Sequence, residues 1–185
     1  MNEQTSGTLA QIQPLLATCE LPSIGPEPRQ SRLSIPELEK QLGFIFPKAG
    51  LSATQQSLIR SLVFLWHDHL DESHSLSQEI HTPDGSFLHG ILHRREPDYW
   101  NAKYWFNRVG SHASFPEISR RAGAFLDNNS AGELKAQLLP GNRWDPMAFV
   151  DACEAALKRK DSRQIELLER LQEIELRVLL EHFCR

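Results

Sequence analysis

The sequence predicts an all-α protein built as a single helical domain. From residue 52 to the C-terminus, apolar residues recur at three- and four-residue spacing, which is the period of a helix with one buried face. No stretch shows the alternation of β-branched and polar residues that is typical of a strand. The chain has 185 residues, of which 40% are hydrophobic and 24% charged. Such a chain can bury a core without disulfides or a structural metal.

Prolines distinguish the first part of the chain from the rest. Six of the 11 prolines lie within the first 47 residues, and they prevent residues 21–32 from forming a helix or a central strand. We therefore predict a Pro-rich N-terminal arm over residues 1–50, with short helices near 7–18 and 34–42. A helical domain follows over residues 51–185. The sequence leaves open whether the arm packs on this domain.

Two long helices are expected in the domain. The first covers about residues 52–80, because Ser52 is a suitable N-cap and an apolar stripe follows it, made of Leu58, Leu62, Leu65, Trp66 and Leu70. A Thr-Pro-Asp-Gly turn is expected to end this helix. The second covers about residues 161–184, with Asp161 or Ser162 as its first residue.

Shorter helices are expected between the two long ones, over about residues 86–96, 99–109, 115–127, 131–138 and 146–158. Pro97 ends the first of them. Asp98 and Asp145 can serve as N-caps for the helices that follow them. Gly110 is expected to close its helix in a left-handed conformation.

Charge and cysteine content argue against several classes of protein. Lys and Arg number 20 against 24 Asp and Glu, a formal net charge of −4, so a nucleic-acid partner is not expected. No apolar run approaches the roughly 18 residues of a membrane span, and the first residues lack the pattern of a secretion signal. The 3 cysteines are far apart and odd in number, which does not suggest a disulfide framework. We therefore expect a cytoplasmic protein without a membrane partner.

Histidines are concentrated in one part of the chain, and seven of the 8 lie between positions 67 and 112. At about 100° per residue, the first long helix carries a polar stripe made of His67, Asp71, His74, Gln78 and His81. On the next helix, His89, His93 and Glu96 share one face. Imidazole nitrogen together with carboxylate oxygen is a donor set that zinc and non-haem iron accept. These patterns predict a metal site with His74, His89 and His93 as ligands.

Each of these patterns also has an ordinary structural explanation. The stripe can be the solvated side of an amphipathic helix. His89 and His93 can bind neighbouring carbonyl groups while Glu96 pairs with an arginine. A single His-x3-His spacing is a weak signal, and only the convergence of several helices on one point would make it specific.

The last predicted helix carries an acidic residue on its apolar side. Glu175 falls within the arc formed by Leu168, Leu171, Ile174, Val178 and Leu179. A carboxylate in an apolar layer is costly unless an ion or a cationic side chain receives it. Glu175 is therefore a carboxylate of the site, a salt-bridge partner of Arg94 or Arg95, or a sign that this face is assigned incorrectly.

Residues 98–106 carry much of the aromatic content of the chain. Aromatic residues on nearly all sides of a helix usually indicate burial in the core. The functional alternative is a stacking platform, in which arginines beside aromatic rings hold an anionic or planar ligand. The residues expected to bind a ligand are Arg94, Arg95, Asp98, Asn101 and Arg108.

The stretch from His89 to Trp105 reads HGILHRREPDYWNAKYW, and LWHDHLDESH precedes it at residues 65–74. Together they resemble an uncharacterised family of small all-helical proteins, found in bacteria and expected also in fungi, that shares an HGILHRREPDxxNAxYW block. The resemblance covers about residues 60–116, with a weaker similarity in the last helix. It implies an all-helical fold and adds weight to His74, His89, His93 and Glu96. It implies no activity, substrate or cofactor.

The leading functional hypothesis is a polar pocket between the first long helix, the short helix after it and the last helix, lined by His74, His89, His93, Glu96 and Glu175. The pocket would hold a divalent metal, zinc or iron, or a small anionic ligand. In an enzyme, Glu96 or Glu175 would be the catalytic carboxylate.

Two alternatives remain beside this hypothesis. One is a non-catalytic protein-interaction module whose histidines are structural. The other is an enzyme that uses His and Glu as acid and base without metal. The sequence does not decide whether the protein is an enzyme, and a homo-oligomer is compatible with it.

Overall fold

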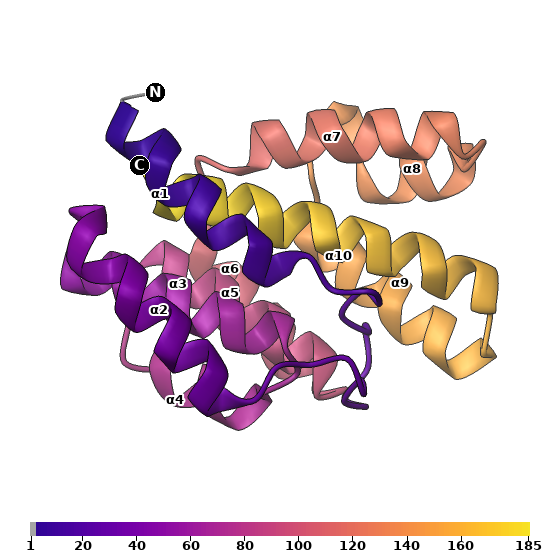
Figure 1. The fold of residues 1–185 in the computed structure, drawn as a ribbon. Helices are drawn as coiled ribbons and strands as arrows, with labels where there is room; N and C mark the ends of the chain where they lie inside the picture. Colours follow the sequence, from indigo (N-terminus) through magenta and orange to yellow (C-terminus); the bar gives the residue numbers. More distant parts are fainter. Residues whose placement is uncertain (1–2) are drawn as a thin grey trace.

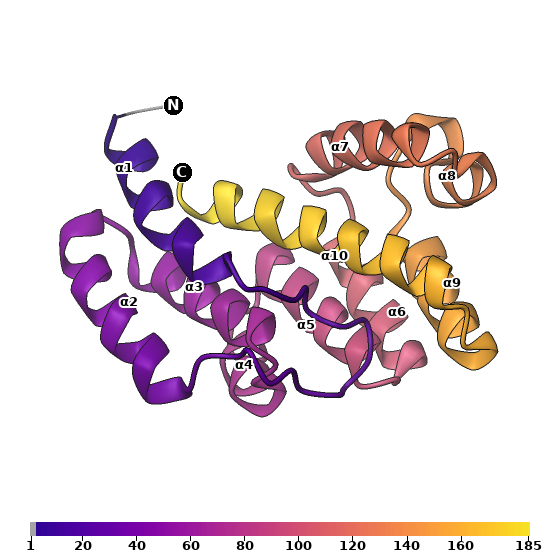
Figure 2. The ribbon, with the colours of Figure 1, turned by 45° about the vertical axis from the view of Figure 1, so that its right-hand side comes forward.

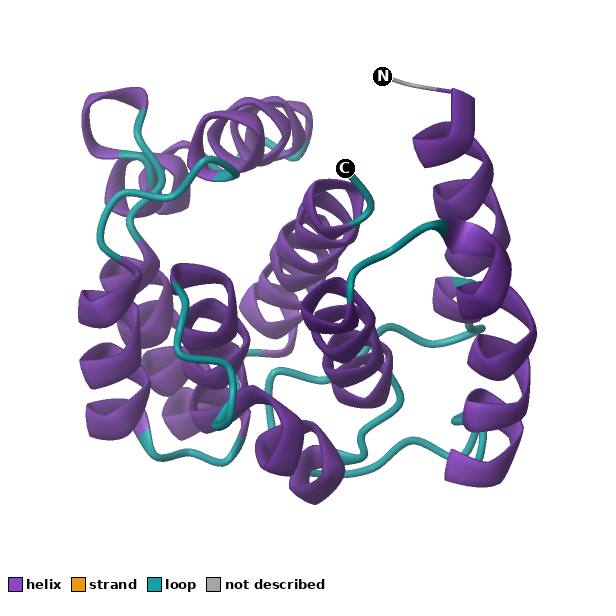
Figure 3. Ribbon diagram, turned by 90° about the vertical axis from the view of Figure 1, so that its left-hand side faces the viewer, coloured by secondary structure: helices purple, strands orange, loops and turns teal. Residues whose placement is uncertain are grey.

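The computed structural model describes residues 3–185 of the chain, with side chains from residue 7 onward. Within these residues all regular structure is helical, which confirms the predicted all-α class (Figure 3). The first two residues of the predicted arm lie outside the described residues. Figure 1 labels the helices, and their bounds are α1 (Glu3–Ile12), α2 (Ile35–Ala49), α3 (Ala53–Trp66), α4 (Leu70–Ser77), α5 (Pro83–Arg95), α6 (Tyr99–Val109), α7 (Phe115–Asn128), α8 (Gly132–Leu138), α9 (Pro146–Arg159) and α10 (Ser162–Phe183). Two short 3-10 helices, η1 (Gln13–Leu16) and η2 (Pro140–Asn142), complete the described part.

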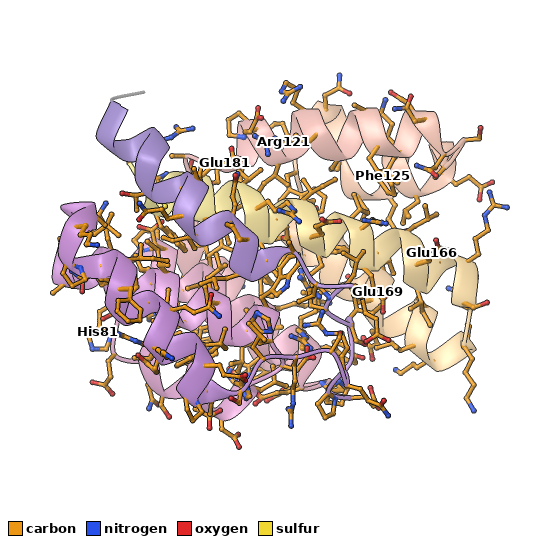
Figure 4. The ribbon with its side chains drawn as sticks, viewed as in Figure 1. His81, Arg121, Phe125, Glu166, Glu169 and Glu181 are labelled. Atoms are coloured by element: carbon orange, nitrogen blue, oxygen red, sulfur yellow. The ribbon has the colours of Figure 1, made fainter. Side chains whose placement is uncertain are left out.

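Helix α10 lies through the middle of the molecule (Figures 1 and 2). Helices α3, α7 and α9 pack against it, and its buried side includes Leu168, Leu171, Leu176, Leu179 and Phe183. On the α7 side, Arg121 donates two hydrogen bonds to the carboxylate of Glu181, at 2.8 and 2.6 Å (Figure 4). The second predicted long helix is therefore confirmed, and it organises the helices around it.

The prediction of one long helix over residues 52–80 is wrong, because the helix is interrupted at Asp68. Helix α3 ends at Trp66 and α4 begins at Leu70, while Asp68 has a φ of 62°. The carboxylate of Asp68 accepts hydrogen bonds from Arg95 Nη2 at 2.6 Å and Arg29 Nε at 2.8 Å. Asp tolerates the left-handed region better than most residues. These two arginines therefore hold a bend that the periodic leucines do not reveal.

Other predicted boundaries agree within a few residues, with four corrections. The helix expected from residue 86 begins at Pro83, because Thr82 is its N-cap and accepts a hydrogen bond from Gly85 N at 3.2 Å. The Thr-Pro-Asp-Gly sequence thus starts α5 and is not a separate turn. The helix expected over 34–42 continues as α2 to Ala49, and the helix expected over 7–18 is α1 followed by η1. Gly110 closes α6 with a φ of 60°, but its ψ of −127° lies outside the left-handed helical region.

The N-terminal arm packs on the rest of the chain. Residues from α1, η1, α2 and the segment between them belong to the same apolar core as α3, α5 and α10. Ile12, Ile24, Leu38 and Leu42 are each 0% exposed. The two predicted parts of the chain therefore share one core.

Side chains from distant helices bind the irregular segment between η1 and α2. Gln172 of α10 donates to the carbonyl oxygens of Pro22 and Ser23, each at 3.0 Å. Next to α3, His67 Nδ1 accepts a hydrogen bond from Leu33 N at 3.1 Å. Buried backbone groups need such partners when no helix or sheet supplies them. These contacts let a Pro-rich segment without regular structure lie against the core.

No helix among the described residues combines the length and the apolar composition needed to cross a membrane.

Asp68→Asn should lower the free energy of unfolding by about 3 kcal/mol, since it leaves the buried guanidinium of Arg95 without a negative partner. Asparagine keeps the size of the side chain and tolerates the positive φ. The matched control is Asp151→Asn, whose half-exposed carboxylate pairs with Lys103 at the surface and should cost about 1 kcal/mol or less. Denaturant unfolding measures both values. Equal effects of the two substitutions would contradict this role of Asp68.

Candidate metal centre

The three predicted metal ligands come together between α4 and α5. One ring nitrogen from each of His74, His89 and His93 lies within 4.8 Å of the other two. The ring centroids are 4.6 Å apart for His74 and His89, 5.4 Å for His74 and His93, and 4.7 Å for His89 and His93. His89 and His93 are 2% and 6% exposed, and His74 is half-buried. We call these three residues the histidine cluster.

The other histidines of the predicted stripe do not join the cluster, because the predicted helix is broken at Asp68, before His74, and α4 ends at Ser77, before His81. His67 is 0% exposed, and its Nε2 is 2.8 Å from the carbonyl oxygen of Leu15. His81 is exposed and lies at the edge of the molecule (Figure 4). The stripe prediction is therefore wrong for His67 and His81, although His74 does meet the pair on α5.

The oxygen atoms beside the two α5 imidazoles are placed as they are around metal-ligating histidines. A ligating imidazole uses one nitrogen for the metal and donates the N–H of the other to an acceptor. His93 Nδ1 is 2.9 Å from Glu96 Oε2; the approach lacks the angle of a hydrogen bond, which a small rotation of the ring would supply. His89 Nδ1 is 3.5 Å from the hydroxyl of Ser77. In both rings an oxygen atom therefore lies near Nδ1, and a metal ion would be bound through Nε2.

Burial keeps the ring of His89 uncharged. Burial and, after it, the nearby His93 and His74 lower the pKa of His89 to about 3. At neutral pH the His89 ring is therefore neutral and carries a lone pair, which is the form that binds a metal ion. Contact with the two neighbouring rings adds to the effect of burial, because a proton on one ring disfavours a proton on the next.

The two carboxylates predicted for the site lie in different places. Glu96 is the C-cap of α5 and is adjacent to His93. Glu175 is 0% exposed and does not belong to the cluster; it accepts hydrogen bonds from Arg94 Nη2 at 2.7 Å and Trp144 Nε1 at 3.2 Å. The expectation that the last helix brings Glu175 to the histidines is wrong. The salt bridge to Arg94, one of the alternatives left open by the sequence, is the arrangement found.

The five residues expected to bind a ligand separate into two groups. Arg94 and Arg95 are 0% exposed and pair with Glu175 and Asp68, so their placement does not support contacts with a ligand. The remaining three are on or next to α6. Asp98 caps the helix by accepting a hydrogen bond from Asn101 N at 3.3 Å.

Asn101 and Arg108 flank the histidine cluster from α6. Asn101 Nδ2 is 3.1 Å from His93 Nε2, so its amide contacts this ring nitrogen. Trp105 stacks on His89 with ring centroids 4.0 Å apart. The guanidinium of Arg108 is 5.4 Å from the Trp105 ring. Helix α6 therefore forms one wall of the candidate centre.

Sequence reasoning missed a second polar group, formed by Asp84, His112 and His182. Asp84 Oδ1 is 2.9 Å from His112 Nε2 and 3.1 Å from His182 Nε2. Although burial opposes it, hydrogen bonds from the two histidines hold the pKa of Asp84 well below its usual range. The three residues come from the start of α5, the loop after α6 and the end of α10. No spacing in the sequence could have linked them.

The second group is less suited to metal than the histidine cluster. His112 Nδ1 accepts a hydrogen bond from Ser114 N at 3.1 Å, so the proton of this ring is on Nε2 and is donated to Asp84. That is the opposite of the tautomer that a ligand bound through Nε2 requires. This group joins three segments of the chain by hydrogen bonds.

A wide cleft in another part of the molecule is a separate feature. It has a volume of about 1110 Å³ and lies among α7, η2 and the start of α9, with Trp144 and His112 among its lining residues. The histidine cluster does not line it. The candidate centre is instead a small, mostly buried site between α4, α5 and α6.

Comparisons with models of protein families, with curated proteins and with solved structures find no match for this chain. Functional inference therefore depends on the geometry and chemistry of the site.

Without added metal, the stability of the protein should fall as pH decreases from about 6.5. The unfolded chain binds a proton on His89 near the ordinary pKa of 6.5, whereas the folded chain does so only near 3, so acid favours the unfolded state. His89→Gln should reduce the number of protons that are taken up on unfolding in this pH range by up to about one. The measurement is denaturant unfolding at several pH values between 4 and 7.

His81→Gln is the matched control, because this histidine is exposed; it should retain the pH dependence of the unmodified protein. If His89→Gln retained it as well, His89 would not be held in its neutral form by the fold.

Proposed function

We propose that the protein binds one divalent transition-metal ion, zinc or iron(II), through His74, His89 and His93. The observation that carries this proposal is the convergence of three imidazoles from two helices, with ring nitrogens within 4.8 Å of one another. Metal–nitrogen bonds are about 2.0–2.1 Å long, so small side-chain rotations would close the cluster around an ion.

The chemistry of the donors supports zinc or iron over calcium or magnesium. Neutral imidazole is a ligand for zinc, iron, copper and nickel, whereas calcium and magnesium require several oxygen ligands. Glu96 offers a carboxylate next to the cluster, through its contact with His93. A carboxylate in this position orients the ring and raises its basicity as a ligand.

Three protein ligands leave a coordination position for water or a small anion. In zinc enzymes this open position distinguishes catalytic sites from structural ones, which have four protein ligands. The proposed centre would suit metal-assisted hydrolysis or, with iron, oxidation. In this proposal Glu96 orients His93 from the side of Nδ1, and Glu175 has no part in the chemistry.

The metal proposal is tested first by stoichiometry. Protein purified without a His-tag and supplied with zinc should hold about one equivalent by elemental analysis, and His89→Ala/His93→Ala should hold almost none, since two of three ligands are lost. His81→Ala and His182→Ala are matched controls that should retain the metal. Small and equal amounts of zinc in all four proteins would overturn the proposal.

Chelation gives a second result that does not depend on a variant. If the folded state binds zinc, a free zinc concentration of 100 times Kd should raise the free energy of unfolding by about 2.7 kcal/mol, and a chelator should remove this gain. The non-catalytic interaction module with structural histidines predicts a melting temperature that neither zinc nor chelator changes.

Glu96→Gln should weaken zinc binding by about 10- to 100-fold without abolishing it, because the ring of His93 keeps its position but loses its anionic partner. Isothermal titration calorimetry measures the change. Glu79→Gln, which alters an exposed carboxylate at the end of α4, is the control. An affinity that Glu96→Gln leaves unchanged would remove Glu96 from the centre.

A further inference from the structure

Helix α6 exposes two large aromatic rings beside the candidate centre. Trp100 is 79% exposed and Tyr104 is 45% exposed. They are one helical turn apart and stack with ring centroids at 6.2 Å and an interplanar angle of 14°. Exposed aromatic surface of this size on one face often marks a binding site.

A continuous series of ring contacts connects this surface to the histidine cluster. Trp100 stacks on Tyr104, Tyr104 contacts the edge of Trp105 at a centroid distance of 5.5 Å, and Trp105 stacks on His89 at 4.0 Å. The exposed rings are therefore continuous with the wall that α6 forms at the candidate centre.

A cation without an anionic partner lies on the same surface. Arg108 is exposed, and its guanidinium is 5.9 Å from the Tyr104 ring and 5.4 Å from the Trp105 ring. Among the described residues it forms no ion pair with a carboxylate, in contrast to Arg120 and Arg121 of the next helix. An arginine that rests on aromatic rings can still bind an anion through its N–H groups.

We propose that Trp100, Tyr104, Trp105 and Arg108, here called the α6 ledge, bind a small molecule that has a planar aromatic ring and an anionic group. The ring stacks on Trp100 and Tyr104, and the anionic group pairs with Arg108 on the side of the histidine cluster. This inference rests on the proposed function, because it names the class of ligand that the metal centre receives.

The observations favour this occupant over a second copy of the chain. Apolar contacts alone would suit a dimer interface. The ledge, however, combines stacked rings with an unpaired cation, and it lies next to the centre that is proposed to hold a metal ion with an open coordination position. An aromatic anion satisfies all three features at once, since stacking, ion pairing and attraction to the metal each use a different part of it.

The test uses benzoate and the indole N–H signals of the four tryptophans in ¹H–¹⁵N spectra. Trp66 and Trp144 are internal references, because their Nε1 atoms donate to Thr18 and Glu175 inside the protein. Benzoate should shift the signals of Trp100 and Trp105 in a saturable way and leave the references unchanged. Cyclohexanecarboxylate and benzyl alcohol, which lack the aromatic ring and the charge respectively, should need roughly tenfold higher concentrations.

Matched variants test the residues of the ledge. Trp100→Ala and Arg108→Gln should each weaken benzoate binding by about three- to tenfold, whereas Phe44→Ala and Arg143→Gln, which alter an exposed ring and an exposed arginine on other elements, should not. All four positions are at the surface, so the variants should fold. Adenosine 5′-monophosphate as a second probe distinguishes a nucleotide from an aromatic acid, and saturable binding of either supports the ledge.

The outcomes separate this inference from the metal proposal. Protein that holds zinc by elemental analysis should bind benzoate more tightly than zinc-free protein, because the ion adds positive charge beside Arg108. If zinc does not bind, the metal proposal fails, while the Trp100 and Trp105 signals of zinc-free protein still decide whether the ledge is a site. The inference is overturned if benzoate leaves the Trp100 and Trp105 signals unshifted, or if benzoate and cyclohexanecarboxylate bind equally. It is also overturned by equal benzoate affinity with and without bound zinc, or by a dimer in sedimentation that Trp100→Ala dissociates.

Discussion

The buried ion pair between Arg95 and Asp68 determines the path of the chain through the core. Both side chains are 0% exposed, and a buried charge is tolerated only where its partner meets it in good geometry. The pair stops α3 at Trp66, turns the chain into α4 and, through Arg29, holds the end of the irregular N-terminal segment. Because α4 begins where this bend directs it, His74 faces α5. The candidate centre therefore depends on an interaction in which none of its own residues takes part.

Three consecutive residues of α5 serve three different neighbours. Successive side chains point about 100° apart around a helix, so His93 faces the cluster, Arg94 reaches Glu175 on α10, and Arg95 reaches Asp68 after α3. The compact His-Arg-Arg sequence is thus a polar junction between helices that are distant in the chain. Its two arginines were expected to bind a ligand, but their burial assigns them to the packing of the fold. Of these three residues, only His93 lies at the candidate centre.

Local patterns predicted most of the helices and the pair on α5, since caps and apolar periodicity act within a few residues. His89, His93 and Glu96 were placed on one face for the same reason. The break at Asp68 could not be predicted, because the leucine spacing continues across it and its cause lies in arginines that are far away in the sequence. The choice of Arg94 as the partner of Glu175 is also a matter of tertiary packing. Asp84, His112 and His182 come from three separate segments, so no local pattern connects them.

The groups that face the second ring nitrogen explain why two groups of histidines in one small protein should behave differently. An imidazole binds a metal with one nitrogen only if the other can keep a proton, and it keeps that proton where an acceptor faces it. Glu96 and Ser77 supply oxygen atoms to His93 and His89, whereas the backbone N–H of Ser114 faces His112 and forces its proton to the opposite side. The arrangement on α4 and α5 suits the proposed binding of an ion, whereas the group around Asp84 already has its protons distributed among its own members. The same kind of residue provides a candidate reactive centre in one place and a link between three segments in the other.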